Sequence, residues 1–134
     1  NMQHTLYLIR GLPGSGKSDL ANEMLDNGLV GYSYEADDYC VNENEEYVFN
    51  PKYLKEAHER CQMNTKAMLK FDSVAVSNTS TTESEVETYR KIAEEAGARF
   101  VSIVVENRHE GKNVHGVPEE VLQKMQKRFT LKLI

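Results

Sequence analysis

The chain has 134 residues, of which 40% are hydrophobic, and its formal net charge at pH 7 is −5. This length suffices for one hydrophobic core, so we expect a single domain over residues 2–134. The sequence has no apolar run near the roughly 20 residues that cross a bilayer, and its start does not resemble a signal peptide. Cys40 and Cys61 lack neighbouring zinc ligands, so we expect reduced thiols and a cytoplasmic protein.

Short apolar runs alternate with amphipathic stretches along the chain. The runs are rich in branched and aromatic residues and have the length of strands. They predict strands at residues 6–9, 32–34, 74–77 and 100–105. Strands that alternate with helices are typical of βαβ units, so the expected fold class is α/β with a parallel sheet.

A glycine-rich turn joins the first strand to a helix that we expect to begin near Lys17. Its sequence, GLPGSGKS from Gly11 to Ser18, matches G-x-x-x-x-G-K-[ST] in the strand-to-helix context that this motif requires. Glycines let successive N–H groups converge on a phosphate, and the helix start adds its positive dipole end. The nucleotide-binding residues expected are Gly11, Pro13, Gly14, Ser15, Gly16, Lys17 and Ser18. Lys17 can reach the terminal phosphates of ATP, and the Ser18 hydroxyl can ligate Mg²⁺.

Two adjacent carboxylates, Asp37 and Asp38, follow the second strand. Ligands of doubly wound proteins bind at the carboxyl ends of the strands, which places this pair beside the phosphate loop. A carboxylate there can accept a proton from a substrate hydroxyl that attacks the γ-phosphorus of ATP. A helix cap or solvated turn is the alternative interpretation, and position favours the catalytic one.

The next two helices carry start signals. Asn50 can cap a helix that begins at Pro51, and Thr82 and Glu85 have the spacing of a capping box, with Gly97 ending that helix. The expected buried faces are Leu54, Ala57, Cys61 and Met68 in the first helix, and Val86, Tyr89, Ala93 and Ala96 in the second.

The part of the chain after Asn107 is basic, whereas the acidic residues concentrate before it. Arg108 and Lys112 lie in a loop after the fourth strand, where either cation can neutralise charge on a transferred phosphoryl group. His109 and His115 have no metal-site spacing and are taken as loop or packing residues. The last helix begins at Pro118. We expect Val121, Leu122, Met125 and Phe129 on its buried face and Lys124, Lys127 and Arg128 mostly in solvent. Residues 40–50 and 107–116 are expected to form long surface loops.

Five segments in this order carry a resemblance: RGLPGSGKS, ADDY, YVFNPKYLKEAHERCQ, VAVSNTSTTESEVETY and NVHGVPEEVLQKM. The chain resembles the kinase domain of phage polynucleotide 5′-kinase and its small P-loop relatives, which approach the zeta-toxin-like kinases. The resemblance implies a three-layer α/β/α P-loop fold with strand order 2-3-1-4-5. It also implies Asp37 as general base and metal-site residue, Ser18 as magnesium ligand, and Arg108 with Lys112 as lid cations.

The chain departs from the polynucleotide kinases at two positions. Cys40 replaces an arginine that orients the acceptor phosphate in those kinases, and Asn78 replaces an aspartate. Asn78 can instead hydrogen-bond an acceptor or hold the Asp37 loop. The acceptor therefore stays open between a nucleic acid 5′ end, a nucleotide and a small metabolite. An ATP-binding or ATPase module without efficient phosphoryl transfer is the alternative function, and a scaffold with a vestigial phosphate loop is the third.

Overall fold

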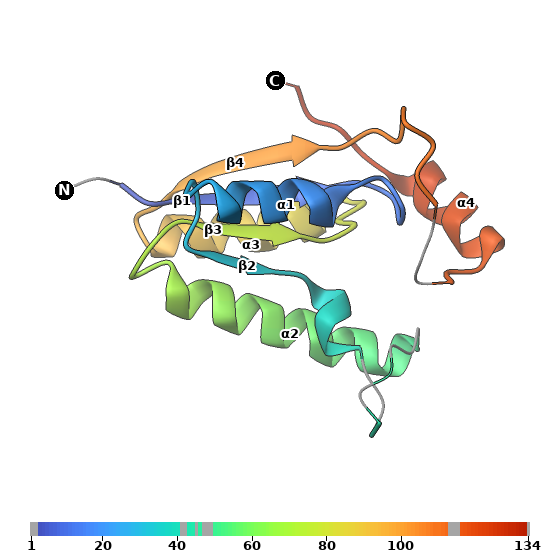
Figure 1. Cartoon of the computed structure of the whole chain (residues 1–134), viewed down its shortest axis with the longest axis horizontal. Helices are drawn as coiled ribbons and strands as arrows, with labels where there is room; N and C mark the ends of the chain where they lie inside the picture. Colours follow the sequence, from blue (N-terminus) through green and yellow to red (C-terminus); the bar gives the residue numbers. More distant parts are fainter. Residues whose placement is uncertain (1–2, 41–42, 45, 47–49, 113–115, 134) are drawn as a thin grey trace.

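Figure 1 shows the computed structural model, which describes residues 3–40, 43–44, 46, 50–112 and 116–133. Its strands are β1 (Thr5–Arg10), β2 (Tyr32–Tyr34), β3 (Val74–Ser77) and β4 (Arg99–Val104), and they form one parallel sheet in the order β2-β3-β1-β4. The expected α/β class is confirmed. The described ranges contain four strands of the expected order, and the fifth strand that we expected is not among them.

The central strand β1 is buried on both faces, as a parallel sheet covered by helices requires. Leu6 and Leu8 belong to one core cluster and Ile9 to a second, and all three are fully buried. Successive side chains of a strand point to opposite faces, so the two clusters lie on opposite sides of the sheet.

Helices cover both faces of the sheet and complete three layers (Figure 1). Helix α1 (Lys17–Asp26) packs its buried residues Ala21 and Met24 against Ile9 on one face. Helices α2 (Pro51–Met68) and α3 (Glu83–Glu95) cover the other face. Helix α4 (Glu119–Arg128) lies beyond the carboxyl ends of the strands (Figure 1). Within the described ranges no helix is both long and apolar enough to cross a membrane.

The predicted helix starts are confirmed. The Asn50 side chain accepts a hydrogen bond from the Lys52 N–H, and Thr82 and Glu85 form a reciprocal capping box. The prediction for Ala96 was wrong, because this residue caps the end of α3 and is exposed.

We expected Phe129 on the buried face of the last helix, but this residue lies just after that helix. Helix α4 ends one residue earlier, and Phe129 has extended backbone angles. The Phe129 ring packs against the guanidinium of Arg10, with 4.6 Å between Cζ and the ring centroid.

A buried cation fixes the loops at the carboxyl edge of the sheet. Arg10, at the end of β1, is only 3% exposed. Its Nε donates to the Ser80 carbonyl at 2.7 Å, and its Nη2 donates to the Thr130 carbonyl at 2.8 Å. One side chain therefore holds the end of β1, the segment before α3 and the segment after α4. Neither composition nor periodicity predicts this role of Arg10.

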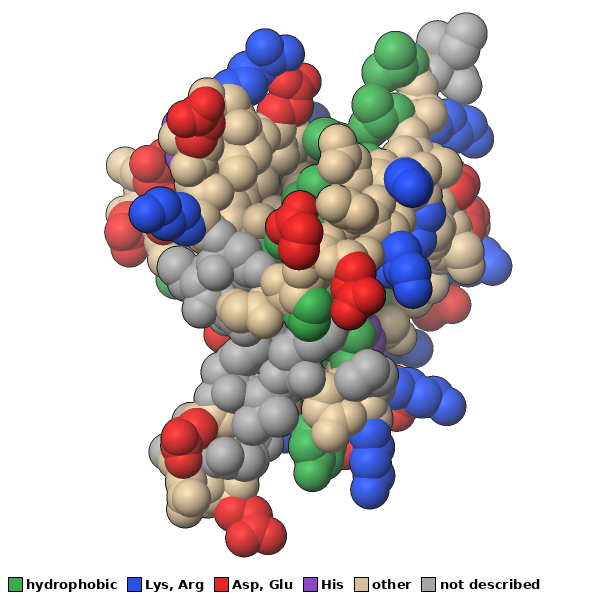
Figure 2. Space-filling model, turned by 90° about the vertical axis from the view of Figure 1, so that its right-hand side faces the viewer, with side chains coloured by type: hydrophobic (Ala, Val, Ile, Leu, Met, Phe, Trp, Pro, Cys, Tyr) green, Lys and Arg blue, Asp and Glu red, His purple; other side chains and the backbone are tan. Residues whose placement is uncertain are grey.

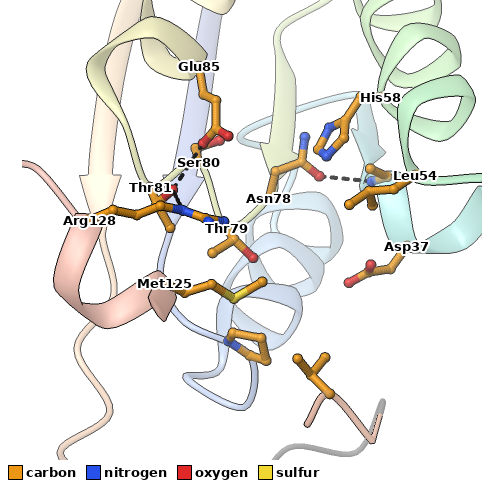
Figure 3. A pocket seen from close by; sticks show the side chains of 13 residues that line it. Asp37, Leu54, His58, Asn78, Thr79, Ser80, Thr81, Glu85, Met125 and Arg128 are labelled. Atoms are coloured by element: carbon orange, nitrogen blue, oxygen red, sulfur yellow. Dashed lines mark hydrogen bonds between the residues drawn. The ribbon is translucent and has the colours of Figure 1, made fainter. Parts of the chain in front are cut away.

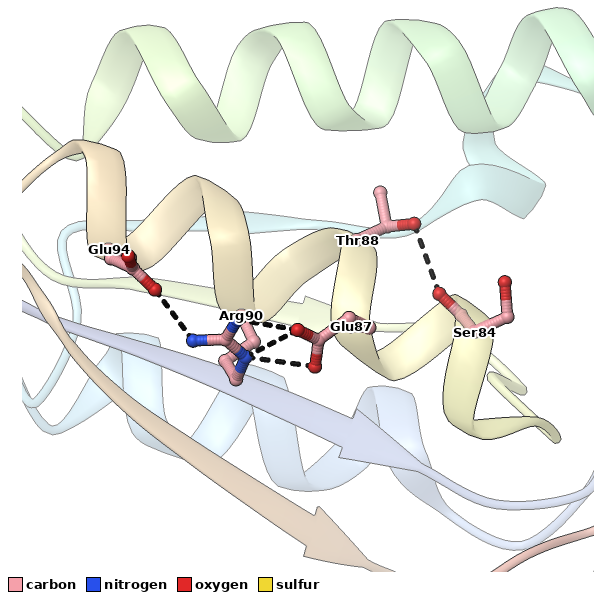
Figure 4. Close-up of polar contacts among 5 residues, drawn as sticks. All are labelled: Ser84, Glu87, Thr88, Arg90 and Glu94. Atoms are coloured by element: carbon pink, nitrogen blue, oxygen red, sulfur yellow. Dashed lines mark hydrogen bonds and ion pairs between the residues drawn. The ribbon is translucent and has the colours of Figure 1, made fainter.

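The outer face of α3 carries an exposed charge cluster (Figure 4). Arg90 lies between Glu87 and Glu94 and pairs with both carboxylates. These pairs raise the pKa of Arg90 and lower the pKa of Glu87. Solvent screens such exposed pairs, so they contribute little to the stability of the fold.

The capping box at Thr82 gives a stability prediction. Thr82→Ala removes the side-chain acceptor of the Glu85 N–H and should lower the free energy of unfolding by about 1 kcal/mol. Urea unfolding followed by circular dichroism measures this. Thr88→Ala is the matched control, because the partly buried Thr88 lies inside the same helix and its hydroxyl donates to the Ser84 carbonyl, away from the cap (Figure 4). Equal losses in the two variants would contradict the capping role.

Candidate functional site

The phosphate loop lies between β1 and α1, where the sequence motif placed it. Gly14 and Gly16 have φ angles of 87° and 95°, which side-chain-bearing residues rarely adopt. Gly16 is the N-cap of α1, and Lys17 is its first residue. The first N–H groups of a helix have no intrahelical partner, so this turn presents donors and a positive dipole end to an anion.

A cavity of about 350 Å³ lies over this loop, and we call it the P-loop cavity. It is lined by Pro13, Gly14, Gly16, Lys17, Ser18, Asp19, Glu35, Asp37, His109, Gly111 and Lys112. The Lys17 Nζ donates to the Leu12 carbonyl at 3.1 Å. Burial lowers the pKa of Lys17, and the carboxylates of Asp37 and Glu35 partly offset that effect. The structure therefore gathers most of the predicted nucleotide-binding residues around one space, whereas Gly11 and Ser15 lie behind the loop beside β4.

Two parts of the chain contribute oxygen-bearing side chains to this cavity. The Ser18 hydroxyl donates to Glu35 Oε2 at 2.7 Å, and Asp37 lines the same cavity. Hard oxygen ligands of this kind suit Mg²⁺, which binds through one or two protein groups and retains water and phosphate ligands. Sequence analysis missed Glu35, although it directly precedes the ADDY segment at the end of β2.

The structure separates the two acidic residues of that segment. A short 3-10 helix, η1 (Ala36–Tyr39), follows β2 and carries both. Asp37 is partly buried and lines the P-loop cavity, whereas Asp38 is exposed. The register of η1 thus favours Asp37 as the residue that faces bound phosphates.

The loop after β4 contacts the phosphate loop. The Asn107 side chain closes a turn, accepting from the Gly111 N–H at 2.7 Å and donating to the Gly111 carbonyl at 2.9 Å. A methyl group on Gly111 would lie 2.3 Å from the Gly14 carbonyl oxygen, so the two backbones are in close contact. The His109 ring lies beside Gly16.

The two cations predicted in this loop are placed differently. Lys112 lines the P-loop cavity. Arg108 has an 85% exposed side chain and donates from Nε to the Glu106 carboxylate. His109 lies in this loop, as predicted, and lines the cavity, whereas His115 lies outside the described residues.

A second cavity, the Asn78 cavity, adjoins the first (Figure 3). Pro13 and Asp37 line both cavities. The remaining lining residues come from η1, α2, the β3–α3 segment, α3, and α4 with the segment before it. They are Ala36, Leu54, His58, Asn78, Thr79, Ser80, Thr81, Glu85, Val117, Met125 and Arg128. Asp37 therefore stands between the phosphate loop and a separate space.

Asn78 ties the Asp37 segment to the core. It is 5% exposed, and its Oδ1 accepts a hydrogen bond from the Ala36 N–H at 2.8 Å. Its Nδ2 donates to the Tyr89 hydroxyl at 3.2 Å and to Cys61 Sγ at 3.8 Å. These contacts favour the second of the two roles considered for Asn78, which is to hold the loop that carries Asp37.

His58 contributes an uncharged group to the Asn78 cavity. Burial lowers the pKa of His58, and the carboxylates of Glu85 and Asp37 only partly oppose that shift, so the imidazole is neutral at neutral pH. An α2–α3 groove continues from here, and it shares His58, Ser80 and Glu85 with the cavity.

Comparison with known proteins identifies the family of this chain. A family model described as an AAA domain matches residues 6–131. The chain belongs to this AAA-domain family. Human NEDD4-binding protein 2 is 32% identical over 129 residues, which represents 90% of this chain and 7% of that protein. The chain thus spans only a small part of the length of this relative.

Solved structures share the fold of this AAA-family domain. A chain of the Pnkp1/Rnl/Hen1 RNA repair complex is 22% identical, with a TM-score of 0.65 over 100% of this chain and 41% of that one. APS kinase CysC of Mycobacterium tuberculosis is 18% identical, with a TM-score of 0.62 over 96% and 98%. A gluconokinase from Sinorhizobium meliloti 1021 is 18% identical, with a TM-score of 0.59 over 97% and 77%. The domain therefore has a P-loop, kinase-like fold.

The Asn78 contacts give a second prediction. Asn78→Ala leaves the buried Ala36 N–H without its acceptor, which should lower the free energy of unfolding by about 2 kcal/mol and speed hydrogen exchange at that amide. Chemical denaturation and exchange measured by NMR test both effects. Asn27→Ala is the control, because the exposed Asn27 side chain bonds only the Glu23 carbonyl within its own helix. Unchanged exchange at Ala36 in the first variant would contradict the positioning role.

The close approach of Gly111 gives a third prediction. Gly111→Ala places a methyl group against the Gly14 carbonyl, so the loop should move away from the phosphate loop. We expect the amide resonances of Gly14 and Gly16 to shift while the unfolding midpoint stays nearly constant. Glu110→Ala, in the same turn but exposed, should leave these resonances in place. Identical spectra for wild type and Gly111→Ala would show that the two loops do not touch.

Proposed function

We propose that this domain is an ATP-dependent kinase that transfers the γ-phosphate of ATP to a hydroxyl group of an acceptor. The observation that carries the proposal is the position of Asp37, which lines both the P-loop cavity and the adjoining Asn78 cavity. A carboxylate between a phosphate site and a second space suits a general base that faces a nucleotide on one side and an acceptor on the other. The shared fold with solved kinases supports this assignment.

The phosphate loop would hold the triphosphate through its N–H groups and Lys17. Asp37 would accept the proton of the acceptor hydroxyl while that oxygen forms a bond to the γ-phosphorus. The bond between the γ-phosphorus and the β–γ bridging oxygen then breaks, and ADP leaves. Ser18 and Asp37, with Glu35 beside them, would hold Mg²⁺, which when bound neutralises charge on the phosphate oxygens.

Cations of the loop after β4 would stabilise the charge of the transferred group. Lys112 already lines the P-loop cavity, whereas Arg108 would have to exchange Glu106 for a phosphate oxygen. We therefore assign the first contact to Lys112 and keep Arg108 as the second lid cation.

The acceptor can be a nucleic acid 5′ end, a nucleotide or a small metabolite, and the distribution of surface charge favours the smaller ones. Figure 2 looks onto the end of the molecule that carries α4, and basic and acidic side chains are interspersed on it. A long nucleic acid is usually met by a continuous basic stripe, so this mixture favours a short nucleotide or a small metabolite over a long strand. We place the reaction in the cytoplasm, which the free, buried thiols of Cys40 and Cys61 support.

The test is transfer of label from γ-labelled ATP, with Mg²⁺, to panels of 5′-hydroxyl oligonucleotides, nucleosides, nucleotides and sugars. Asp37→Asn should bind ATP normally and lower transfer by roughly 10²-fold or more, because the amide cannot accept the proton. Asp38→Asn is the matched control and should retain most activity, since Asp38 is exposed.

Lys17→Ala separates binding from chemistry. It should weaken ATP binding in calorimetry without unfolding the domain, because the one hydrogen bond of the ammonium among the described residues goes to the Leu12 carbonyl of the loop itself. Label released as inorganic phosphate, with none on any acceptor, would indicate an ATPase module. Full transfer by Asp37→Asn would exclude Asp37 as the base.

A further inference from the structure

The His109 ring lies against the phosphate loop at the start of α1. A Cβ atom on Gly16 would lie 3.3 Å from His109 Cε1 and 3.4 Å from His109 Nε2. The ring thus takes the room that the missing side chain of Gly16 leaves, and it lines the P-loop cavity. Because Gly16 is the N-cap of α1, the imidazole lies beside the first turn of that helix.

The turn that carries His109 is anchored to the rest of the site. The Asn107 side chain bonds both the N–H and the carbonyl of Gly111, which closes the turn around His109. Gly111 is in turn in close contact with the Gly14 carbonyl. A Cβ atom on Gly111 would lie only 2.9 Å from His109 Nε2, so the ring also packs over this glycine. The protein itself therefore sets the position of the imidazole.

The ring nitrogens of His109 are available to a ligand. The side chain is exposed, and within the described ranges the imidazole makes no hydrogen bond or ion pair, whereas the neighbouring Arg108 pairs with Glu106. An imidazole always carries at least one N–H donor, since the neutral ring has one and the protonated ring has two. His109 can therefore donate to a phosphate oxygen in either protonation state.

The adjoining helix start supplies the other donors of the same site. The Leu20 N–H donates to the Gly16 carbonyl at 3.2 Å, and the N–H groups of residues 17–19 have no acceptor inside the helix. In loops with this motif, such N–H groups hold the α- and β-phosphates, while the lysine reaches the β- and γ-phosphates. His109 lies beside Gly16, and hence beside the α- and β-phosphates rather than beside the transferred γ-phosphate.

We infer that His109 is a nucleotide-binding residue, whose imidazole donates a hydrogen bond to the diphosphate part of the nucleotide. This inference rests on the proposed function, since it requires that the P-loop cavity takes a nucleotide. ATP and ADP share the diphosphate part, so the bond forms with substrate and product alike. An interaction that is equally strong in the ground state and the transition state lowers KM without raising kcat. His109 thus differs from Lys112, which acts on the transferred group.

Calorimetry with ADP and with a non-hydrolysable ATP analogue, both with Mg²⁺, tests this role. His109→Phe keeps a planar ring against Gly16 but removes the donor. We expect it to weaken binding of both nucleotides about tenfold, the equivalent of one lost charge-assisted hydrogen bond. His109→Gln retains an amide donor and should recover part of this loss. Glu110→Gln, in the same turn and exposed, is the matched control and should bind both nucleotides like the wild type.

The imidazole can also be observed directly by NMR. In a long-range ¹H–¹⁵N spectrum, the ring nitrogens of His109 should shift when Mg²⁺ and ADP are titrated. His4 is the internal reference, because its Nδ1 hydrogen-bonds the Leu69 carbonyl at 2.7 Å beside the start of β1, and its signals should stay in place. The role of His109 is excluded if its ring signals do not shift. It is also excluded if His109→Phe binds ADP as tightly as the wild type.

Transfer of label separates this inference from the proposed kinase. His109→Phe should raise KM for ATP and leave kcat nearly constant, whereas Lys112→Ala should lower kcat. Transfer by the wild type, combined with normal ADP binding by His109→Phe, would retain the kinase and reject the role of His109. Nucleotide binding that depends on His109, without label on any acceptor, would retain that role and reject the kinase. A wild type that binds neither nucleotide would reject both.

Discussion

The placement of Asp37 depends on a buried hydrogen bond at the start of η1, from the Ala36 N–H to Asn78 Oδ1, and the Asn64 amide holds the other end through the Tyr39 hydroxyl. Helix η1 is only four residues long and has no side-chain cap, so its position cannot come from its own hydrogen bonds. The amide of Asn78 supplies the missing constraint because it is itself held by α2 and α3, through Cys61 and Tyr89. An asparagine suits this role, since it accepts one hydrogen bond and donates the other two without introducing a charge.

Arg10 performs the corresponding task at the end of the neighbouring strand β1. The guanidinium is buried, so its donors must be satisfied by protein groups, and carbonyl oxygens of Ser80, Thr81 and Thr130 accept them. These carbonyls belong to the segments before α3 and after α4. Asn78 and Arg10 lie at the ends of adjacent strands, and these two polar side chains fix the loops between which the cavities lie. The loops are therefore positioned by side-chain hydrogen bonds as well as by regular secondary structure.

Sequence predicted the features that local chemistry determines. The phosphate loop, the four strands and the helix caps at Asn50 and Thr82 all follow from spacing and from turn or cap chemistry. The preference for Asp37 over Asp38 came from the family resemblance. The structure added what only tertiary contacts decide. Glu35 bonds the Ser18 hydroxyl across the P-loop cavity, and the turn closed by Asn107 turns His109 rather than Arg108 toward that cavity. Hydrophobic periodicity cannot predict these contacts. The bond between Glu35 and Ser18 joins segments that are distant in the chain, and the position of His109 depends on the geometry of one turn.

The charges around the phosphate loop explain how a half-buried lysine is tolerated before a nucleotide binds. Burial lowers the pKa of Lys17, and the carboxylates of Glu35 and Asp37 oppose this by stabilising the ammonium. Glu35 is in turn bonded by the Ser18 hydroxyl, so a hydrogen bond stabilises this carboxylate while the carboxylates stabilise the Lys17 ammonium. A triphosphate alone would bring further negative charge to these carboxylates, whereas a triphosphate with a divalent cation would engage Lys17 and the carboxylates together. In the proposed function, the same arrangement of charges would therefore favour the nucleotide as its magnesium complex.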